Sequence, residues 1–337
     1  MSAYPSSSVR ALGPYTVSAV GLGCMNLSHA YGAPPSEEEG AALLNRALDL
    51  GCSHLDTAAL YSGGANERVL GSAVMHCRSE FTLASKCVLD LVDGQRVLDG
   101  SPQAIARTLD AALGRLGTDR IDLYYLHRLD RRVPVEDSVG ALVRAREAGK
   151  IGAIGLSEMG SAMIRRAHAV HPVAAVQTEY SPVSRNAEIA VLDTCRELGI
   201  AFVAFSPVAR GMLAGAVRSD GYLPGDIRRG FPRYVEPRLG RNLRLVDRFD
   251  ALAREAGLTP AQLSIGWGLA KAPHLVSIPG TTSVAHLEEN MAARPIAPDL
   301  VAAVDALFPP GALDGARYAP PMQAQIDTEQ FPDEAAA

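Results

Sequence analysis

Four polar side chains, Asp56, Tyr61, Lys86 and His127, lie at or just beyond the ends of short apolar segments. A tyrosine hydroxyl is a weak acid with an ordinary pKa of about 10. A neighbouring ammonium favours the phenolate, so we expect Lys86 to lower the pKa of Tyr61 and Asp56 to hold Lys86. An imidazole such as that of His127 can hydrogen-bond a carbonyl oxygen and orient it. Together these groups predict a proton donor for the reduction of a carbonyl by an external hydride source.

Each of these residues also has an ordinary structural explanation when it is taken alone. Asp56 could cap a turn, and Lys86 could be a solvated strand end. Tyr61 could lie on the surface, and His127 could be a hydrogen-bonded core residue. Three segments in succession, HLDTA, FTLASK and IDLYYLH, nevertheless carry a titratable group at or near their ends. That recurrence favours one site built from the ends of several strands.

Eight apolar segments of this kind alternate with longer amphipathic segments. We predict strands at 19–25, 54–58, 81–86, 121–127, 151–157, 174–180, 201–207 and 274–280. Eight strands that alternate with helices predict an α/β fold, a (β/α)8 TIM barrel whose active site lies at the carboxyl ends of the strands. An open doubly wound sheet is the alternative. The glycine motif expected after its first strand fails, because Asn26 stands at the third glycine.

The predicted barrel has additions at both ends. Residues 9–18 are expected to form a β-hairpin that precedes the first barrel strand. Two long segments, at 208–240 and 309–337, are expected to form walls or lids of the pocket, since long connections in compact domains are usually functional or disordered. We therefore predict a single barrel domain over residues 1–337.

Composition narrows the classes of function. The formal net charge is −5 and no basic stripe is evident, which argues against nucleic-acid binding. No apolar stretch has the length of a membrane span, and the N-terminus shows no secretory signal. The five cysteines are scattered and lack a CxxC spacing, which favours reduced thiols, a cytoplasmic location and no zinc site. His29, His54 and His76 form no obvious ligand set, which disfavours a metal-dependent barrel isomerase or hydrolase.

The chain resembles the aldo-keto reductase superfamily over nearly its whole length. The resemblance is carried by DTAALY, the strand-end Lys86, LYYLHRLD, GLSE, QTEYSP, FSPVARG and IPGTTSVAHLEEN. The HRLD and IPGTT segments resemble bacterial members of the non-mammalian branch. The resemblance implies that Tyr61 is the general acid. It also implies that Lys86 and Asp56 tune this acid and that His127 orients the substrate.

The resemblance further implies a nicotinamide cofactor. Ser157, Glu158 and Gln177 match positions that hold the nicotinamide carboxamide, and Phe205 matches the aromatic residue that stacks on its ring. Many relatives have Asn in place of Glu158, whose carboxylate would have to accept from the carboxamide NH₂. The other implied cofactor contacts are Gly23, Met25, Asp56, Ser206, Pro207, Val208, Arg210, Gly211, Gly280, Thr281, Thr282, Ser283, His286, Glu289 and Asn290.

The segment that would bind the adenosine 2′-phosphate departs from the family pattern. Relatives often carry Lys or Arg here, whereas this chain has Ser283 and His286. A phosphate carries a charge of about −1.5 to −2 near neutral pH, and a half-neutral imidazole is a weaker partner for it than Arg. We therefore expect NADPH as the cofactor, with reduced discrimination against NADH.

The expected substrate is a small-molecule aldehyde or ketone. Phe231, Tyr234 and Tyr318 are candidate aromatic residues of its pocket wall. The sequence names neither a particular substrate nor an oligomeric state. A regulatory barrel that binds NADPH with little turnover is the alternative to an enzyme, and the complete set of four catalytic residues favours the enzyme.

Overall fold

The structure is a computed structural model that describes residues 8–28 and 30–331. Both ends of the predicted domain 1–337, the last residues of the predicted tail 309–337, and His29 therefore lie outside the described residues.

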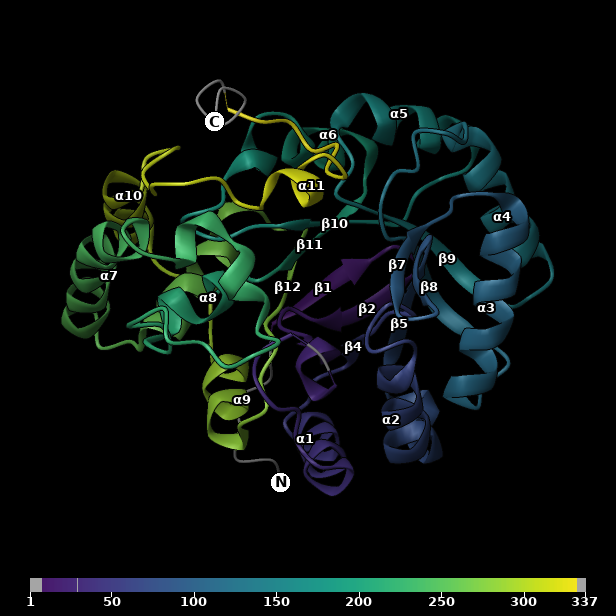
Figure 1. Cartoon of the computed structure of the whole chain (residues 1–337), viewed down its shortest axis with the longest axis horizontal. Coiled ribbons are helices and arrows are strands. Elements are labelled where there is room, and N and C mark those ends of the chain that lie inside the picture. Colours follow the sequence, from purple (N-terminus) through teal and green to yellow (C-terminus); the bar gives the residue numbers. More distant parts are fainter. Residues whose placement is uncertain (1–7, 29, 332–337) are drawn as a thin grey trace.

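Eight parallel strands form the central sheet, and helices surround it (Figure 1). The strands are β3 (Leu22–Gly23), β4 (His54–Asp56), β5 (Thr82–Cys87), β8 (Ile121–Leu126), β9 (Ile151–Ser157), β10 (Ala175–Glu179), β11 (Ala201–Phe205) and β12 (Leu275–Ile278). They follow one another in sequence order across the sheet. A parallel bridge between Val20 and Ser277 joins the first edge to the last. The sheet thus closes on itself, and the predicted (β/α)8 barrel is confirmed.

The helices are α1 (Glu37–Asp49), α2 (Ala65–Val74), α3 (Pro102–Leu116), α4 (Val135–Glu147), α5 (Ser161–Val170), α6 (Val191–Leu198), α7 (Arg238–Glu255), α8 (Pro260–Lys271), α9 (Val284–Met291), α10 (Pro298–Leu307) and α11 (Pro320–Gln323). Four of the helices, α1, α3, α8 and α9, begin at a side chain that caps them. Ser36 and Glu39 form a reciprocal capping box at α1. Ser101 caps α3, whose first residue is Pro102. Among the described residues, no helix combines the length and the apolarity needed to cross a membrane.

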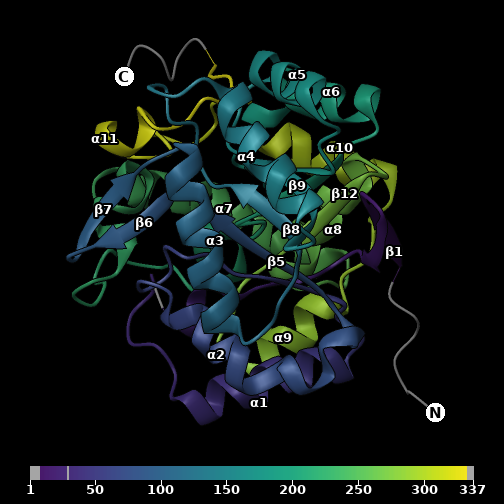
Figure 2. The same cartoon turned by 90° about the vertical axis from the view of Figure 1, so that its right-hand side faces the viewer.

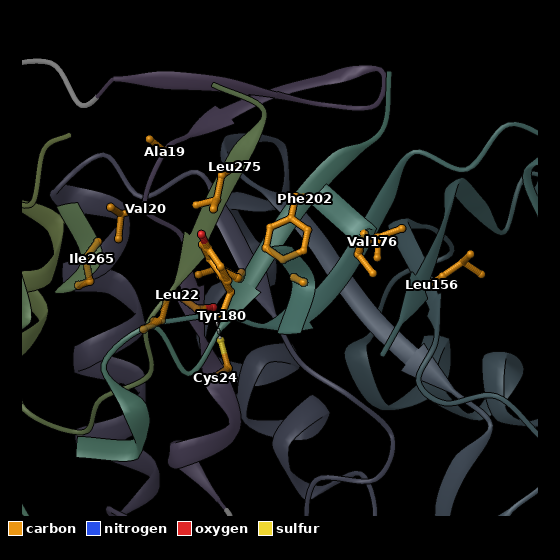
Figure 3. Close-up of a cluster of buried hydrophobic side chains, with 14 of the residues drawn as sticks. Ala19, Val20, Leu22, Cys24, Leu156, Val176, Tyr180, Phe202, Ile265 and Leu275 are labelled. Carbon is orange, nitrogen blue, oxygen red and sulfur yellow. Dashed lines mark hydrogen bonds between the residues drawn. The ribbon is translucent and has the colours of Figure 1, made fainter. Parts of the chain in front are cut away.

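Apolar side chains pack on both faces of the barrel strands. Figure 3 shows part of the layer between strands and helices, to which Val176, Phe202 and Leu275 of the strands and Ile265 of α8 all belong. A second cluster fills the barrel interior and includes Val203. This burial on both faces explains why the strands appear in the sequence as nearly continuous apolar runs.

The N-terminal hairpin closes one end of the barrel. It consists of β1 (Val9–Leu12) and β2 (Tyr15–Ser18), which pair antiparallel as predicted for residues 9–18. Leu12 and Val17 join the interior cluster beside Ala175 and Ala201, the first residues of β10 and β11. The hairpin therefore covers the amino ends of the strands and leaves their carboxyl ends to the site.

A second hairpin, over residues 89–98, is not predicted by the sequence pattern. Strands β6 (Leu89–Val92) and β7 (Gln95–Leu98) pair antiparallel directly after β5 and project at the left of Figure 2. The long connection 208–240 is partly ordered into short 3₁₀ helices, and α7 begins within it at Arg238. The tail after α10 carries α11 and lies over the barrel (Figure 1).

Candidate active site

Three of the four predicted catalytic residues lie at the carboxyl ends of neighbouring strands. Asp56 ends β4, Lys86 is the penultimate residue of β5, and His127 directly follows β8. These strands are adjacent in the barrel, so their ends meet on one rim. Tyr61 lies in the turn that follows β4, where its backbone amide donates to the Ala58 carbonyl at 3.1 Å. The fold therefore brings all four residues to one place.

The Lys86 ammonium is the centre of this cluster. It pairs with the Asp56 carboxylate, donates to the Thr57 carbonyl oxygen at 2.7 Å, and lies 3.4 Å from the Tyr61 hydroxyl. The Lys86 side chain is fully buried. The other Asp56 oxygen accepts a hydrogen bond from Gln177 Nε2 at 2.7 Å. A buried charge is tolerated when it is paired and hydrogen-bonded, and Lys86 meets that condition.

Burial decides the protonation of this cluster. It raises the pKa of Tyr61, while the Lys86 ammonium acts in the opposite direction. Lys86 thus lowers the pKa of Tyr61 as predicted, but removal of water from the phenol outweighs this effect and the net pKa is raised. Burial also opposes the charge on Lys86, but Asp56 and Tyr61 outweigh it and raise the pKa of Lys86. At neutral pH Tyr61 keeps its proton and Lys86 keeps its charge.

The His127 ring lies beside Tyr61. The two rings are arranged edge to face with centroids 6.0 Å apart. Burial lowers the pKa of His127 well below its ordinary value, and the neighbouring cations Arg128, Lys86 and Arg96 lower it further. The imidazole is therefore neutral and has one ring N–H that can donate to a carbonyl oxygen.

A cavity of about 720 Å³ lies above the cluster and is lined by both Tyr61 and His127. Its size is within the range of small-molecule and cofactor sites. Most of the predicted cofactor contacts line it as well. These are Gly23, Met25, Asp56, Ser157, Gln177, Phe205, Ser206, Pro207, Val208, Arg210, Gly211, Gly280, Thr281, Thr282, His286, Glu289 and Asn290.

The cavity wall offers groups that fit a dinucleotide. Phe205 presents a partly exposed ring at the end of β11. In the loop that follows, Ser206, Ala209 and Arg210 have φ values of +49°, +48° and +52°. Side chains rarely adopt this left-handed conformation, and it concentrates at functional sites. The amino end of α9 supplies backbone amides of the kind that bind anions. An aromatic face, a strained loop and a helix terminus thus line one cavity.

A model of the aldo/keto reductase family matches residues 19–308. The chain belongs to the aldo/keto reductase family. It is 42% identical over 323 residues to a Schizosaccharomyces pombe protein named aldo-keto reductase yakc, a match that covers 90% of this chain and 95% of the relative. That relative is from a yeast, so the bacterial branch suggested by the sequence stays a prediction.

Solved structures give the same fold. The glycerol dehydrogenase of Gluconobacter oxydans superposes with a TM-score of 0.81 at 23% identity, covering 96% of this chain and 97% of that one. An aldo/keto reductase of Klebsiella pneumoniae, solved with NADP and acetate, superposes with a TM-score of 0.71 at 24% identity and covers 92% and 100% of the two chains. At these identities the likeness concerns the barrel itself.

Glu158 does not have the position that the family resemblance implied. Its side chain is fully buried and does not line the cavity. One carboxylate oxygen accepts from the Glu179 amide at 2.9 Å, and the other accepts from Arg317 at 2.7 Å and Thr328 at 2.9 Å. Both oxygens are thus engaged by protein groups. In this aldo/keto reductase Glu158 holds the C-terminal tail, and its predicted contact with the carboxamide is wrong.

Ser283 also lies outside the cavity lining. Its hydroxyl accepts from the His286 amide at 3.4 Å and so caps α9. His286 itself is exposed at the cavity edge. Of the two residues that stand in for Lys or Arg, only His286 is therefore placed to face a phosphate.

Several lining residues were not named individually from the sequence, although the loop 87–100, the residues after His127 and the segment 208–240 are the predicted pocket wall. Arg96, Arg128 and Arg228 line the cavity, as does Tyr31, over whose ring the Arg228 guanidinium lies at 5.0 Å. The HRLD segment contains Arg128 and was the one available signal for it. Of the predicted wall aromatics, Phe231 and Tyr318 line the cavity. Tyr234 is buried beneath it and donates to the Ala209 carbonyl at 3.0 Å.

Proposed function

We propose that this aldo/keto reductase is an NADPH-dependent reductase of aldehydes and ketones. The observation that carries the proposal is the buried Lys86 ammonium, held between Asp56 and Tyr61 beneath a cavity that Tyr61 and His127 line. The S. pombe relative has NADP(+) in its name, which supports the same nucleotide for this chain.

Tyr61 acts as the proton donor. Its raised pKa keeps the phenol protonated at neutral pH, so the proton is available for the oxygen of a bound carbonyl. When bound, NADPH supplies a hydride to the carbonyl carbon. The phenolate left on Tyr61 is stabilised by the Lys86 ammonium, which Asp56 holds in place. The neutral His127 ring donates a hydrogen bond to the same oxygen and so orients the substrate.

The nicotinamide is assigned to the ends of β9, β10 and β11. Gln177 uses its amide nitrogen on Asp56, which leaves its carbonyl oxygen to accept from a carboxamide NH₂. The Ser157 hydroxyl lies in the same wall, and the Phe205 ring offers a stacking face. We assign the pyrophosphate to residues 206–211. The adenosine portion is assigned to the residues after β12, namely Gly280, Thr281, Thr282, His286, Glu289 and Asn290.

The molecule is further proposed to act as one barrel domain in a reducing compartment such as the cytoplasm. The N-terminal hairpin packs into the barrel interior, and the tail bonds to Glu158, which supports one domain. All five cysteines are free, which supports a reducing compartment.

A panel of aldehydes and ketones assayed with NADPH tests the function. We expect NADPH absorbance to fall with reactive aldehydes, and to fall equally fast in the presence of a metal chelator. NADPH binding without turnover above the level of Tyr61→Phe would instead support the regulatory barrel. Loss of activity in the chelator would support metal-dependent chemistry.

A further inference from the structure

Four arginines line the cavity, and they differ in their partners. Arg210 pairs with Glu179 at 2.7 Å, and Arg228 pairs with Asp226 at 2.6 Å. Within residues 8–28 and 30–331, neither Arg96 nor Arg128 makes an ion pair with a carboxylate. The cavity therefore has two neutralised arginines and two whose charge is uncompensated.

Arg128 is a buried cation beside the catalytic histidine. Arg128 is only 7% exposed to solvent. Its Nη1 donates to the His127 carbonyl oxygen at 2.6 Å and to the Ser157 hydroxyl at 3.3 Å. Its Nε is buried and has no hydrogen-bond partner among the described residues. Burial of a charge without a counter-charge costs free energy. Proteins keep such a buried charge at functional sites, where a bound ligand can supply the opposite charge.

Arg96 brings a second cation to the same place. It lies on β7, in the hairpin that projects over the carboxyl ends of the strands. Arg96 is exposed as a whole residue, but desolvation of its guanidinium and the charge of Arg128 both lower the pKa of Arg96. Arg96 and Arg128 line the same cavity, so their two guanidinium groups act on one region. The same two cations and Lys86 act on His127, whose pKa they lower. The His127 side of the cavity is therefore positively charged.

This positive region is separate from the part of the cavity assigned to the cofactor phosphates. Arg128 follows β8, whereas residues 206–211 follow β11 and the anion-binding end of α9 follows β12. In the barrel, β9 and β10 lie between β8 and β11. The charge of Arg96 and Arg128 is thus available to the substrate.

We propose that Arg96 and Arg128 bind an anionic group of the substrate, so that the favoured substrates are aldehydes and ketones that carry a carboxylate or a phosphate. This inference rests on the proposed function, because it takes His127 as the residue that holds the carbonyl oxygen. The anionic group lies a few bonds from that carbonyl. Guanidinium groups bind carboxylates and phosphates through paired, charge-assisted hydrogen bonds.

Matched pairs of substrates test the inference. The carboxylate pair is 4-carboxybenzaldehyde and its methyl ester, and the phosphate pair is glyceraldehyde 3-phosphate and glyceraldehyde. In the wild type we expect kcat/KM to be about tenfold higher for the charged member of at least one pair. The pair with the larger ratio identifies the anion. A ratio near or below one in both pairs would overturn the proposal while leaving carbonyl reduction intact.

Arg96→Gln is the decisive variant, because Arg96 is exposed on a hairpin and its replacement leaves the core unchanged. We expect it to lower kcat/KM about tenfold more for the favoured anionic substrate than for its neutral partner. Arg128→Lys, which keeps the charge, should retain more of the preference than Arg128→Gln. Arg107→Gln, on the exposed face of α3, is the matched control and should change neither value. An equal loss for charged and neutral substrates in Arg96→Gln would contradict anion recognition.

A binding measurement separates failure of the inference from failure of the proposed function. Benzoate and inorganic phosphate are titrated calorimetrically into the wild type, Arg96→Gln and Arg107→Gln. We expect the dissociation constant for the favoured anion to rise about tenfold in Arg96→Gln alone. Equal binding by all three proteins would overturn the anion site even if no carbonyl is turned over.

Discussion

Replacement of Arg317 by methionine should destabilise the fold strongly, because it leaves the Glu158 carboxylate buried and unpaired. The two side chains are 3% and 0% exposed, and Nη2 of Arg317 lies 2.7 Å from Oε2 of Glu158. Removal of one partner of such a pair costs about 3–5 kcal/mol. For a chain of 337 residues the unfolding entropy is about 0.7 kcal/mol/K, so Tm should fall by about 4–7 °C.

Urea and thermal unfolding followed by circular dichroism measure this loss. Arg166→Met is the matched control, because its pair with Glu136 has side chains that are 52% and 41% exposed. Such exposed pairs contribute about 1 kcal/mol or less. The double variant Glu158→Gln with Arg317→Met should lose clearly less than the sum of its single changes, since it buries no unpaired charge. A loss in Arg317→Met no larger than in Arg166→Met would refute the reasoning.

Three further predictions concern pH and cofactor choice. Burial raises the pKa of Glu179, but Arg210, together with Arg317, Tyr318 and Arg233, outweighs it and holds the pKa at about 2. The unfolding free energy of the wild type should therefore exceed that of Glu179→Gln above about pH 5, and the gap should close as pH falls toward 2. The ratio of kcat/KM for NADPH over NADH should rise in His286→Arg, and a ratio equal to that of the wild type would exclude a role for this position in binding the phosphate. Because burial raises the pKa of Tyr61, carbonyl reduction should stay level from about pH 6 to 9, and a decline in that range would contradict the assignment.

The sequence was informative about the barrel and the catalytic cluster for one physical reason. Strands that are buried on both faces appear as apolar runs, and a polar residue at the end of such a run stands out. Asp56, Lys86 and His127 were identified in this way, and the structure places them together. The β6–β7 hairpin was missed, although Asp93-Gly94 is a turn signal of the kind that joins short strands.

The remaining discrepancies depend on partners that are distant in the sequence. Glu158 is bound by Arg317, which is 159 residues away, so no local pattern could reveal that its carboxylate is already engaged. The raised pKa of Tyr61 depends on how deeply the fold buries a loop residue. The role of Arg96 depends on the β6–β7 hairpin, because it is this hairpin that brings the Arg96 side chain to the cavity wall.

The central claim is that the Tyr61 hydroxyl gives its proton to a carbonyl during NADPH-dependent reduction. Its most direct test compares kcat at saturating NADPH with the NADPH dissociation constant, in the wild type and in Tyr61→Phe. We predict that kcat falls by about 10²- to 10⁴-fold while the dissociation constant changes by less than about twofold. A Tyr61→Phe protein that binds NADPH normally and keeps a kcat close to that of the wild type would contradict the account.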